Sequence, residues 1–509
     1  MLAKVPGGAV LGIDGYIVYV EVDVSPGLPS FEIVGLPDTA IREARERVRA
    51  ALRNSGYEFP LRRITVNLAP AMIRKEGAGF DLPIAIGILS AIGEVDNGKA
   101  AECVFTGELS LDGHVRGTPG VLSIALGAEK QGFKDMIVAE TNVGEAALVE
   151  ELGIYGAGAL REVVWHLNGV KRIERAKKTA RNLSSVNADG VDFRDVAGQE
   201  HAKRVLEIAA AGSHNALLVG PPGSGKTMLA RRFHTILPPL SWDEALEVTR
   251  VYSASGMLPR GSSIICKRPF RSPHHTISPA GLIGGGRLPK PGEISFAHRG
   301  VLFLDELPEF DGHVLEALRQ PMEDGFVTVA RAGGIAVFPT RFIFLGAMNP
   351  CLCFKRVSTE GISSCTCSPQ SVRRYLNRLS GPLLDRIDLH VEVGQVEVHE
   401  LYEAKDRETS EDIQRRVMKA RESQIARFSG TRITCNAEMG SRDIETYCEP
   451  AKDARTLLYS AVSKLGLSVR SYTRTLKVAR TIADLEGSQR IHVHHVTEAI
   501  GYRMPAFGA

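Results

Sequence analysis

The stretch NALLVGPPGSGKTMLARRF, residues 215–233, places a glycine-rich loop between an apolar strand and a helix. Backbone N–H groups of such a loop, at the N-terminus of a helix, hold phosphate oxygens. Lys226 adds positive charge at the β- and γ-phosphates, and the Thr227 hydroxyl can ligate Mg²⁺. The order of strand, loop and helix therefore predicts a site for ATP and Mg²⁺. Its residues are Gly220, Pro221, Pro222, Gly223, Ser224, Gly225, Lys226 and Thr227.

A second apolar stretch, VLFLDE at residues 301–306, ends in two carboxylates. At the end of a buried strand, Asp305 can hold the Mg²⁺ shell and Glu306 can orient the attacking water. The alternative is that this acidic pair caps the next helix. Asn349 ends a further strand, FIFLGAMN, where it either helps to position the water or forms a turn. With Lys226, these residues are the candidate catalytic groups for ATP hydrolysis.

Four segments follow from composition and apolar spacing. Strands alternating with helical stretches predict a parallel α/β sheet in residues 193–394. Residues 168–192 combine a basic run with small polar residues and are interpreted as a linker. Residues 1–167 mix strands with a capped helix from Asp38 to Asn54, and residues 395–509 are mainly helical.

Overall composition restricts the class of protein. The chain has 509 residues and a formal net charge of only +3, so a polyanionic partner must meet local basic patches. The sequence contains no apolar run long enough to cross a bilayer, and its first residues lack a hydrophobic signal-peptide core. We therefore expect a cytoplasmic protein without membrane contact.

Four of the eight cysteines lie close together in NPCLCFKRVSTEGISSCTC. Cys351 and Cys353 form one Cys-x-Cys pair, and Cys365 and Cys367 form another. Four thiolates can satisfy tetrahedral Zn²⁺ if the intervening loop folds back. The pattern favours a zinc site, and the alternative is four reduced thiols in a loop.

An arginine in GPLLDRIDL, residues 381–389, has a setting that suits phosphoryl transfer. A guanidinium placed on the developing charge accelerates such reactions by about 10³ to 10⁵. Asp385 and Asp388 could aim the Arg386 side chain, or they could simply form a local salt bridge with it. The sequence leaves both interpretations open.

These motifs together resemble one family. The run from DFRDVAGQEHAKRVLE through RPFRSPHHTISPAGLIGGG and PGEISFAHRGVLFLDELPEF to GPLLDRIDL is similar to the magnesium-chelatase-like AAA+ ATPases of the YifB/ComM type. The resemblance implies a P-loop AAA+ core with a C-terminal helical lid. It also implies a homo-oligomeric ring, usually a hexamer, in which Arg386 acts on the ATP of the neighbouring subunit. Arg470 matches the second sensor arginine of the lid, and Arg474 is the competing choice.

The N-terminal segment, residues 1–167, resembles the Lon-protease-like α+β domain found in this family. Proteolysis by that fold needs a serine nucleophile and a lysine that activates it. The corresponding turn, KEGAGFDLP, has no serine, and the later stretch GTPGVLSIA has no lysine. We therefore expect a degenerate domain that serves assembly or nucleic-acid contact, and no peptidase activity.

Two further features lie inside the predicted ATPase core. His274 and His275 belong to a glycine- and proline-rich insertion, interpreted as an ordered loop toward the ring interior and, less favourably, as metal ligands. The stretch FVTVARAGGIAVFPTRFIF predicts a β-hairpin around Gly333 and Gly334. Arg331 and Arg341 suit contact with a DNA backbone, and the alternative is a hairpin that stabilises the subunit interface.

The sequence as a whole favours an ATP-driven ring motor. The resemblance implies DNA, single-stranded or branched, as the substrate and helicase or branch-migration activity in recombination or natural transformation. A chelatase-like subunit, a protein-remodelling motor and a non-hydrolysing scaffold are the alternatives. The intact acidic pair argues against the scaffold. The N-terminal domain argues against the small chelatase motor subunit, which lacks such a domain in the family that the sequence resembles.

Overall fold

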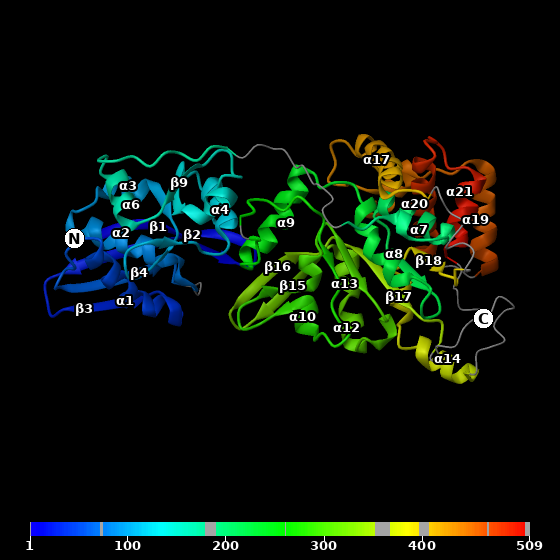
Figure 1. The fold of residues 1–509 in the computed structure, drawn as a ribbon, viewed down its shortest axis with the longest axis horizontal. Coiled ribbons are helices and arrows are strands. Elements are labelled where there is room, and N and C mark those ends of the chain that lie inside the picture. The colour runs from blue at the N-terminus through cyan, green and yellow to red at the C-terminus, as the bar shows by residue number, and fades with distance from the viewer. Residues whose placement is uncertain are drawn as a thin grey trace.

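The computed structural model describes residues 2–71, 75–178, 190–259, 261–351, 367–396, 407–465 and 468–503. An N-terminal domain forms one end of an elongated molecule, an α/β domain forms its middle, and a group of helices lies over the other end (Figure 1). Within these described ranges, no helix combines the length and the apolar character needed to cross a bilayer.

The middle domain contains a parallel five-stranded sheet in the order β11–β14–β17–β10–β18. β10, the first of the five in the chain, lies between the fourth and the fifth, so both its neighbours come from distant sequence. Every residue of β10, β14 and β17 is buried, because helices cover both faces of the sheet. The predicted strands in NALLV, VLFLDE and FIFLGAMN are confirmed. The strands are β10 (Ala216–Val219), β11 (Phe270–Arg271), β14 (Val301–Leu304), β17 (Ile343–Met348) and β18 (Leu389–Glu392).

Short helices and two small β-ribbons complete this domain. The predicted hairpin is confirmed as β15 (Phe326–Arg331) and β16 (Gly334–Pro339), in which Arg331 is opposite Gly334 at the turn. A second ribbon pairs β12 (Gly284–Gly285) with β13 (Lys290–Pro291). The helices are α7 (Glu200–Gly212), α8 (Lys226–Arg232), α9 (Trp242–Ala254), α10 (Pro279–Ile283), α11 (Glu293–Phe296), α12 (Gly312–Ala317), α13 (Arg319–Asp324), α14 (Pro369–Leu376) and α15 (Gly381–Leu384).

The N-terminal domain is built on a mixed seven-stranded sheet in the order β3–β4–β2–β1–β5–β8–β9. Its first helix is the predicted one, since Asp38 caps α1 by accepting a hydrogen bond from the Ile41 amide at 2.8 Å. The strands are β1 (Leu2–Leu11), β2 (Asp14–Ser25), β3 (Ser30–Val34), β4 (Arg63–Ala69), β5 (Cys103–Phe105), β8 (Asp135–Ala139) and β9 (Gly153–Ala157), with a small ribbon of β6 (Glu108–Leu109) and β7 (Val115–Arg116). The helices are α1 (Thr39–Asn54), α2 (Asp81–Ile92), α3 (Asn97–Glu102), α4 (Val121–Lys130), α5 (Val143–Ala146) and α6 (Leu160–Leu167).

Helix α9 joins the N-terminal and middle domains. Trp242, at its start, packs against the core that surrounds α4. Further along, Arg250 forms an ion pair with Asp14 at 2.9 Å, and the carbonyl of Ser253 accepts a hydrogen bond from the amide of Gly120 at 2.8 Å. Apolar packing and polar contacts therefore both hold the N-terminal domain against the middle domain.

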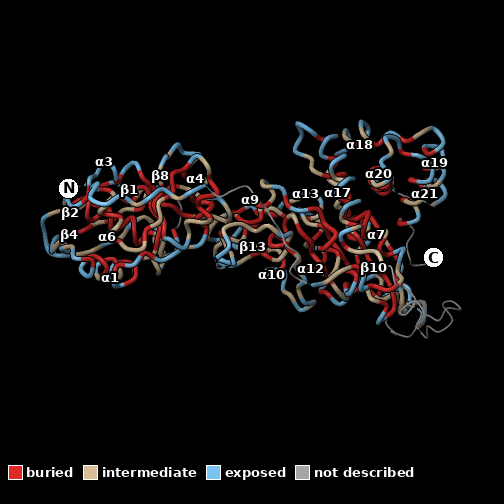
Figure 2. Tube along the Cα trace, turned by 45° about the horizontal axis from the view of Figure 1, so that its top comes forward, coloured by how far each residue is buried: buried red, intermediate tan, exposed pale blue. Residues whose placement is uncertain are grey.

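The C-terminal helices form a layer over α7 (Figure 2). Buried residues of α17, α20 and α21 share one apolar core with α7 and with the five-stranded sheet. The helical character predicted for this region is confirmed within the described residues. Its helices are α17 (Ser410–Arg427), α18 (Ser441–Tyr447), α19 (Lys452–Leu465), α20 (Val469–Leu485) and α21 (Val493–Gly501).

Candidate nucleotide site

The glycine-rich loop follows β10 at the carboxyl edge of the parallel sheet. The amide of Gly220 donates a hydrogen bond to the carbonyl of Met348 at 3.1 Å, which ties the start of the loop to β17. Gly223 and Gly225 have φ angles of 78° and 90°, a conformation that residues with a Cβ rarely adopt. Glycine therefore fixes the turn that opens into helix α8.

Lys226 reaches back across this loop. Its ammonium donates hydrogen bonds to the carbonyls of Gly220 and Pro221 at 2.7 and 2.8 Å, and to Oδ1 of Asn349 at 3.2 Å. Burial lowers the pKa of the ammonium, while the charges of Asp305 and Glu306 oppose that effect. All three acceptors are neutral, so the cation remains available to an anion bound over the loop.

The acidic pair lies beside the loop because β17 alone separates β10 from β14. Thr227 donates a hydrogen bond through Oγ1 to Oδ2 of Asp305 at 2.7 Å. Glu306 follows at the strand end, where it is exposed and has a φ of 52°. Its carboxylate lies 3.9 Å from Nδ1 of His275, a residue of the insertion. The sheet thus brings together Lys226, Thr227, Asp305, Glu306 and Asn349, five of the sequence-predicted residues.

This donor set fits ATP and Mg²⁺. A hydroxyl and a carboxylate in contact are oxygen ligands of the kind that Mg²⁺ takes together with phosphate oxygens. Ser224 supports the fit, because its hydroxyl is buried and has no hydrogen-bond partner in the described part of the chain. Bound Mg²⁺ would neutralise charge on the transferred phosphoryl group. Thr227 and Asp305 would hold the ion, while Lys226 would hold the phosphates.

Arg386 lies at the opposite, amino edge of the sheet. Its carbonyl accepts a hydrogen bond at 3.1 Å from the side chain of Asn215, the residue before β10. At about 3.3 Å per residue, the strand from Asn215 to Gly220 spans roughly 16 Å, which is longer than an arginine side chain. Arg386 is therefore remote from the phosphate-binding loop of its own subunit.

The contacts of Arg386 differ from the local salt bridge weighed as its alternative. Its guanidinium pairs with Glu323 of α13 and donates to the carbonyl of Pro382 at 2.7 Å. Asp388 instead pairs with Arg474 and lies 3.6 Å from His214. Burial would raise the pKa of Asp388, but Arg474 and His214 hold it far below its usual range.

The two candidate sensor arginines on α20 have different environments. Arg470 is exposed, and its guanidinium lies 3.5 Å from Glu323. Arg474 is largely buried and donates to the carbonyl of Arg386 at 2.8 Å as well as to Asp388. Arg474 therefore supports the segment that contains Arg386, whereas Arg470 remains available to a partner. Neither lies at the phosphate-binding loop of its own chain.

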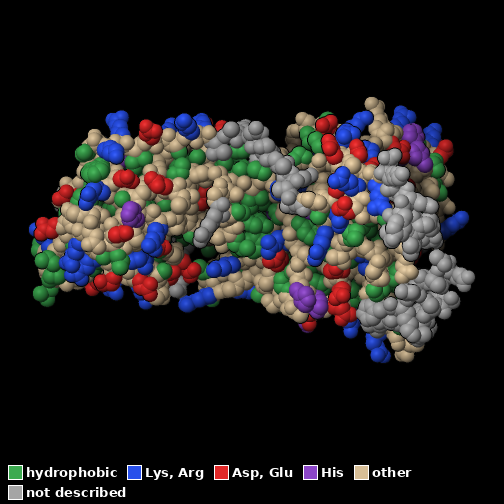
Figure 3. Space-filling view, viewed as in Figure 1, with side chains coloured by type: hydrophobic (Ala, Val, Ile, Leu, Met, Phe, Trp, Pro, Cys, Tyr) green, Lys and Arg blue, Asp and Glu red, His purple; other side chains and the backbone are tan. Residues whose placement is uncertain are grey.

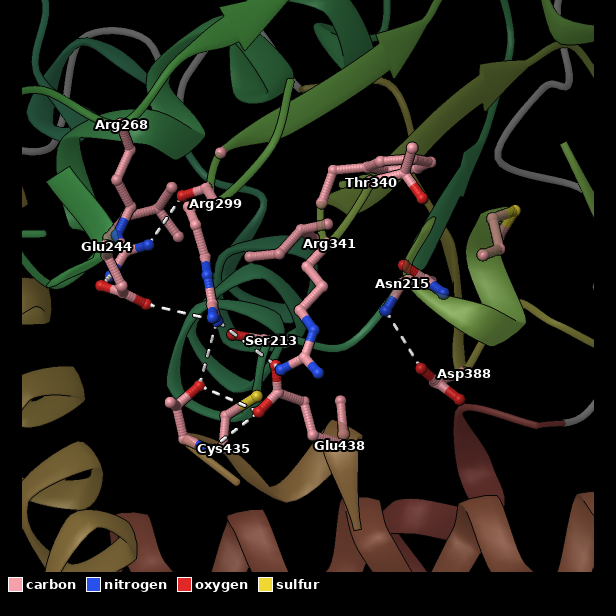
Figure 4. Close-up of a pocket in the computed structure, with 18 of the residues that line it drawn as sticks. Ser213, Asn215, Glu244, Arg268, Arg299, Thr340, Arg341, Asp388, Cys435 and Glu438 are labelled. Carbon is pink, nitrogen blue, oxygen red and sulfur yellow. Dashed lines mark hydrogen bonds and ion pairs between the residues drawn. The ribbon is translucent and has the colours of Figure 1, made fainter. Parts of the chain in front are cut away.

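A charged cavity of about 330 Å³ separates this edge of the sheet from the helical layer (Figure 4). Arg341 points into it and pairs with Glu438 at 2.9 Å, close to Arg299, which lies 3.4 Å from the same carboxylate. Arg331 is elsewhere, exposed at the hairpin turn. The two arginines proposed together as DNA contacts are thus separated, with Arg331 at the hairpin turn and Arg341 paired with Glu438.

A network of charges connects this cavity to α9. Arg299 donates to Glu247 at 2.8 Å, and His298 lies 3.1 Å from the same carboxylate oxygen. Burial alone would raise the pKa of Glu247, but hydrogen bonds from His298 and Arg299 lower it to about 2. Since Arg299 also reaches Glu438, the network links the middle domain to the helical layer.

The metal-site predictions have mixed outcomes. Cys353 and Cys365 lie outside the described residues, whereas Cys351 is buried and Cys367 is half-buried. His274 contacts Thr276, and its ring lies 4.0 Å from that of His275. A cluster that the sequence analysis missed, Glu486 with His494 and His495, lies on the helical layer. There Nδ1 of His495 accepts the amide hydrogen of His492, so Nε2 carries the proton and donates to Glu486 instead of binding a metal.

The turn that would hold a protease serine lines a cavity of about 640 Å³ between the N-terminal and middle domains. Gly77 and Gly79 stand on one side, and Lys290 of the ribbon stands on the other. Lys75, the nearest lysine of the turn, is fully buried, and its ammonium donates to the carbonyls of Gly35, Leu68 and Pro70. Lys75 is thus engaged by the backbone and faces no hydroxyl nucleophile in these contacts.

Comparison with known proteins gives consistent matches along the chain. The family model described as magnesium chelatase, subunit ChlI, matches residues 192–401. Models described as subunit ChlI of Mg-chelatase and as the ChlI C-terminal part match residues 20–142 and 407–503. Competence protein ComM of Haemophilus influenzae is 46% identical over 507 residues, covering 99% of this chain and 97% of that protein.

The chain belongs to the ComM/YifB family. The uncharacterized protein YifB of Escherichia coli is 44% identical, with 97% of this chain and 96% of that protein covered. The magnesium-chelatase 38 kDa subunit of Rhodobacter capsulatus is 26% identical over 45% of this chain and 68% of that subunit. Membership identifies the middle domain and helical layer as an AAA+ ATPase module that uses ATP and Mg²⁺. The suspected family and the fold class of the sequence analysis are thereby confirmed.

Proposed function

We propose that this ComM/YifB protein is an ATP-hydrolysing ring motor that acts on DNA, as a helicase or branch-migration factor in recombination or natural transformation. The proposal of a ring is supported by the position of Arg386, which lies roughly 16 Å across the sheet from the phosphate-binding loop of its own subunit. An arginine at that edge can reach only the nucleotide of a neighbouring copy, and copies that repeat such a head-to-tail contact form a ring when the rotation between them closes. Six subunits are proposed because that is the usual number in the family that the sequence resembles.

Each residue then has a defined part in hydrolysis. Lys226 and the loop amides bind the phosphates, while Glu306 and Asn349 orient the attacking water. Arg386 of one subunit stabilises the charge that develops on the nucleotide of the next subunit. Arg470 lies beside Arg386 and is suited to join it at the same interface.

DNA is the proposed polymer because the similar competence protein of H. influenzae covers the chain almost completely. Basic and acidic side chains are mixed over the face in Figure 3, so contact with DNA must be local rather than spread over a positive surface. Arg331 at the hairpin turn is the candidate contact, with single-stranded or branched DNA as the ligand.

A chelatase-like or protein-remodelling motor is the second candidate. Residues 20–142 match the family model described as subunit ChlI of Mg-chelatase. The N-terminal domain is therefore no argument against a chelatase-like motor. The extent of similarity still favours the DNA motor, because the chelatase subunit of R. capsulatus aligns with only 45% of this chain.

A strand-displacement assay with forked and four-way DNA tests the proposal. We expect ATP-dependent unwinding or branch migration by the wild-type protein and none by Glu306→Gln. Two results together would favour the remodelling motor. DNA would neither stimulate ATP hydrolysis nor be displaced, and a captured protein would stimulate ATP hydrolysis when it is added.

Zinc is proposed as a second, structural metal. The cysteine spacing in the sequence supports it, and Cys351 and Cys367 are the two members of the set within the described residues. Elemental analysis of protein purified without chelators measures it directly.

A further inference from the structure

Glu323, in the last turn of α13, contacts two arginines that come from distant parts of the chain. One carboxylate oxygen, Oε2, pairs with Nη2 of Arg386, and the other, Oε1, lies 3.5 Å from Nη2 of Arg470. α13 belongs to the ATPase core, whereas α20, which carries Arg470, belongs to the helical layer. A single carboxylate therefore brings the two guanidinium groups to one place.

The guanidinium of Arg386 is withdrawn in this arrangement. The residue is only 8% exposed, and each terminal nitrogen donates one hydrogen bond, Nη2 to Glu323 and Nη1 to the carbonyl of Pro382. Its Nε is buried and has no hydrogen-bond partner in the described part of the chain. Arg386 cannot contact an incoming phosphate until its side chain leaves Glu323.

The backbone of Arg386 is fixed independently of its side chain. Asn215 and Arg474 both donate to its carbonyl, at 3.1 and 2.8 Å. Rotation of the side chain alone would therefore expose the guanidinium, with no rearrangement of the sheet edge. Arg470 needs no such release, since its side chain is 62% exposed.

We propose that Glu323 is a positioning residue that holds Arg386 beside Arg470 and releases Arg386 to the triphosphate of a neighbouring copy. This inference rests on the proposed trans action of Arg386. Two guanidinium groups repel each other, and one carboxylate between them offsets that repulsion. A triphosphate carries more negative charge than Glu323, so it takes over Arg386 when the neighbour docks. Glu323 therefore competes with the nucleotide for Arg386.

Glu323→Gln tests this competition, because glutamine keeps the shape of the side chain and removes the charge. We expect ATP turnover at limiting protein concentration to rise about two- to five-fold, the range that a half-exposed ion pair supports. Asp324→Asn is the matched control, since Asp324 is adjacent and lines the same cavity but forms no ion pair with either arginine in the described residues. That variant should hydrolyse ATP at the wild-type rate.

A double-mutant cycle separates competition from simple destabilisation. In an Arg386→Ala background, Glu323→Gln should change turnover no further, and nucleotide affinity should stay at the wild-type value in both backgrounds. The inference is overturned if Glu323→Gln and Asp324→Asn turn over ATP at the same rate. It is also overturned if Glu323→Gln turns over ATP more slowly than the wild type while its thermal midpoint is unchanged. A gain that persists without Arg386 also overturns it.

Failure of the proposed function has a different signature. If Arg386→Ala alone hydrolyses ATP normally, the trans arrangement itself is wrong. If Arg386→Ala is inactive and Glu323→Gln behaves as wild type, the catalytic role of Arg386 stands and only the role of Glu323 is refuted.

Discussion

Replacement of Arg386 by alanine tests whether this arginine takes part in ATP hydrolysis. The variant keeps the phosphate-binding loop, Thr227 and the acidic pair, so nucleotide affinity should be unchanged. Turnover should fall by about 10³ to 10⁵, because only the contact to the developing charge is lost. Steady-state hydrolysis and equilibrium nucleotide binding, measured on the same preparation, separate the two effects.

Mixing Arg386→Ala subunits with Lys226→Ala subunits extends the test. Lys226→Ala lacks a working loop but retains the arginine, so a productive interface needs the pocket of the first variant beside the arginine of the second. In rings assembled at random from equal amounts, about one interface in four meets this condition, and turnover should recover to roughly a quarter of the wild-type value. Arg386 acting within its own subunit predicts no recovery, since neither variant then has a complete site.

Mixed rings must first be shown by sizing the mixture in the presence of ATP. If they form and remain as inactive as either parent, the trans role of Arg386 is wrong. The roughly 16 Å between Asn215 and Gly220 already makes the alternative within one subunit difficult.

Four further changes test separate parts of the structure. Glu306→Gln should bind ATP with wild-type affinity and lose at least about 100-fold in turnover, because water orientation is lost; near-normal hydrolysis would remove Glu306 from the mechanism. Arg331→Ala should lower DNA affinity and reduce the slope of log affinity against log salt by about one, with basal ATP hydrolysis unchanged; an unaltered slope would place DNA elsewhere. The pKa of Glu247 is lowered in the folded protein to about 2 from 4.5, so its stabilising contribution is complete above pH 4.5 and is lost as the pH falls through 2. Between pH 4.5 and 2, the thermal midpoint of the wild type should thus decrease more steeply than the thermal midpoint of Glu247→Gln. If the two midpoints decrease in parallel with pH, the charge network around Glu247 is contradicted. Protein purified without chelators should contain about one zinc per chain that Cys351→Ser removes, and absence of zinc would return these cysteines to reduced thiols.

The nucleotide site could be predicted because each of its parts is local in sequence. The loop from Gly220 to Thr227 and the pair Asp305 and Glu306 each follow directly after an apolar strand, and carboxyl ends of parallel strands share one edge. The contact of Asn349 with Lys226 could not be predicted in the same way, because it depends on the strand order of the sheet. Asn349 follows β17, and β17 lies between β14 and β10. The strands could be recognised from sequence, whereas their order came with the structure.

The sequence contains no comparable pattern for the contacts of Arg386 and Arg470 at the amino edge of the sheet. Glu323 is 63 residues from Arg386 and 147 from Arg470, and no periodic pattern connects them. The two aspartates beside Arg386 were the natural partners in sequence, yet Asp388 is taken by Arg474. The sequence places Arg341 and Arg331 in one hairpin stretch and so predicts one role for both. The register puts Arg331 at the turn and Arg341 beyond the end of β16, where Glu438 of the helical layer binds it.

The contacts around Asp388 also bear on how a ring of such subunits could pass a signal. Arg474 of α20 binds both Asp388 and the carbonyl of Arg386. His214 lies between Asp388 and Thr481 of the same helix, with Nδ1 3.6 Å from the carboxylate and Nε2 2.7 Å from the threonine hydroxyl. His214, Asp388 and Thr481 are buried, and separating buried polar partners costs more than breaking a surface pair. The helical layer and the Arg386 segment therefore move together more readily than apart. A movement of the layer in one subunit would carry the arginine that serves the next nucleotide, so hydrolysis at neighbouring sites would be coupled through α20 rather than through the phosphate-binding loop.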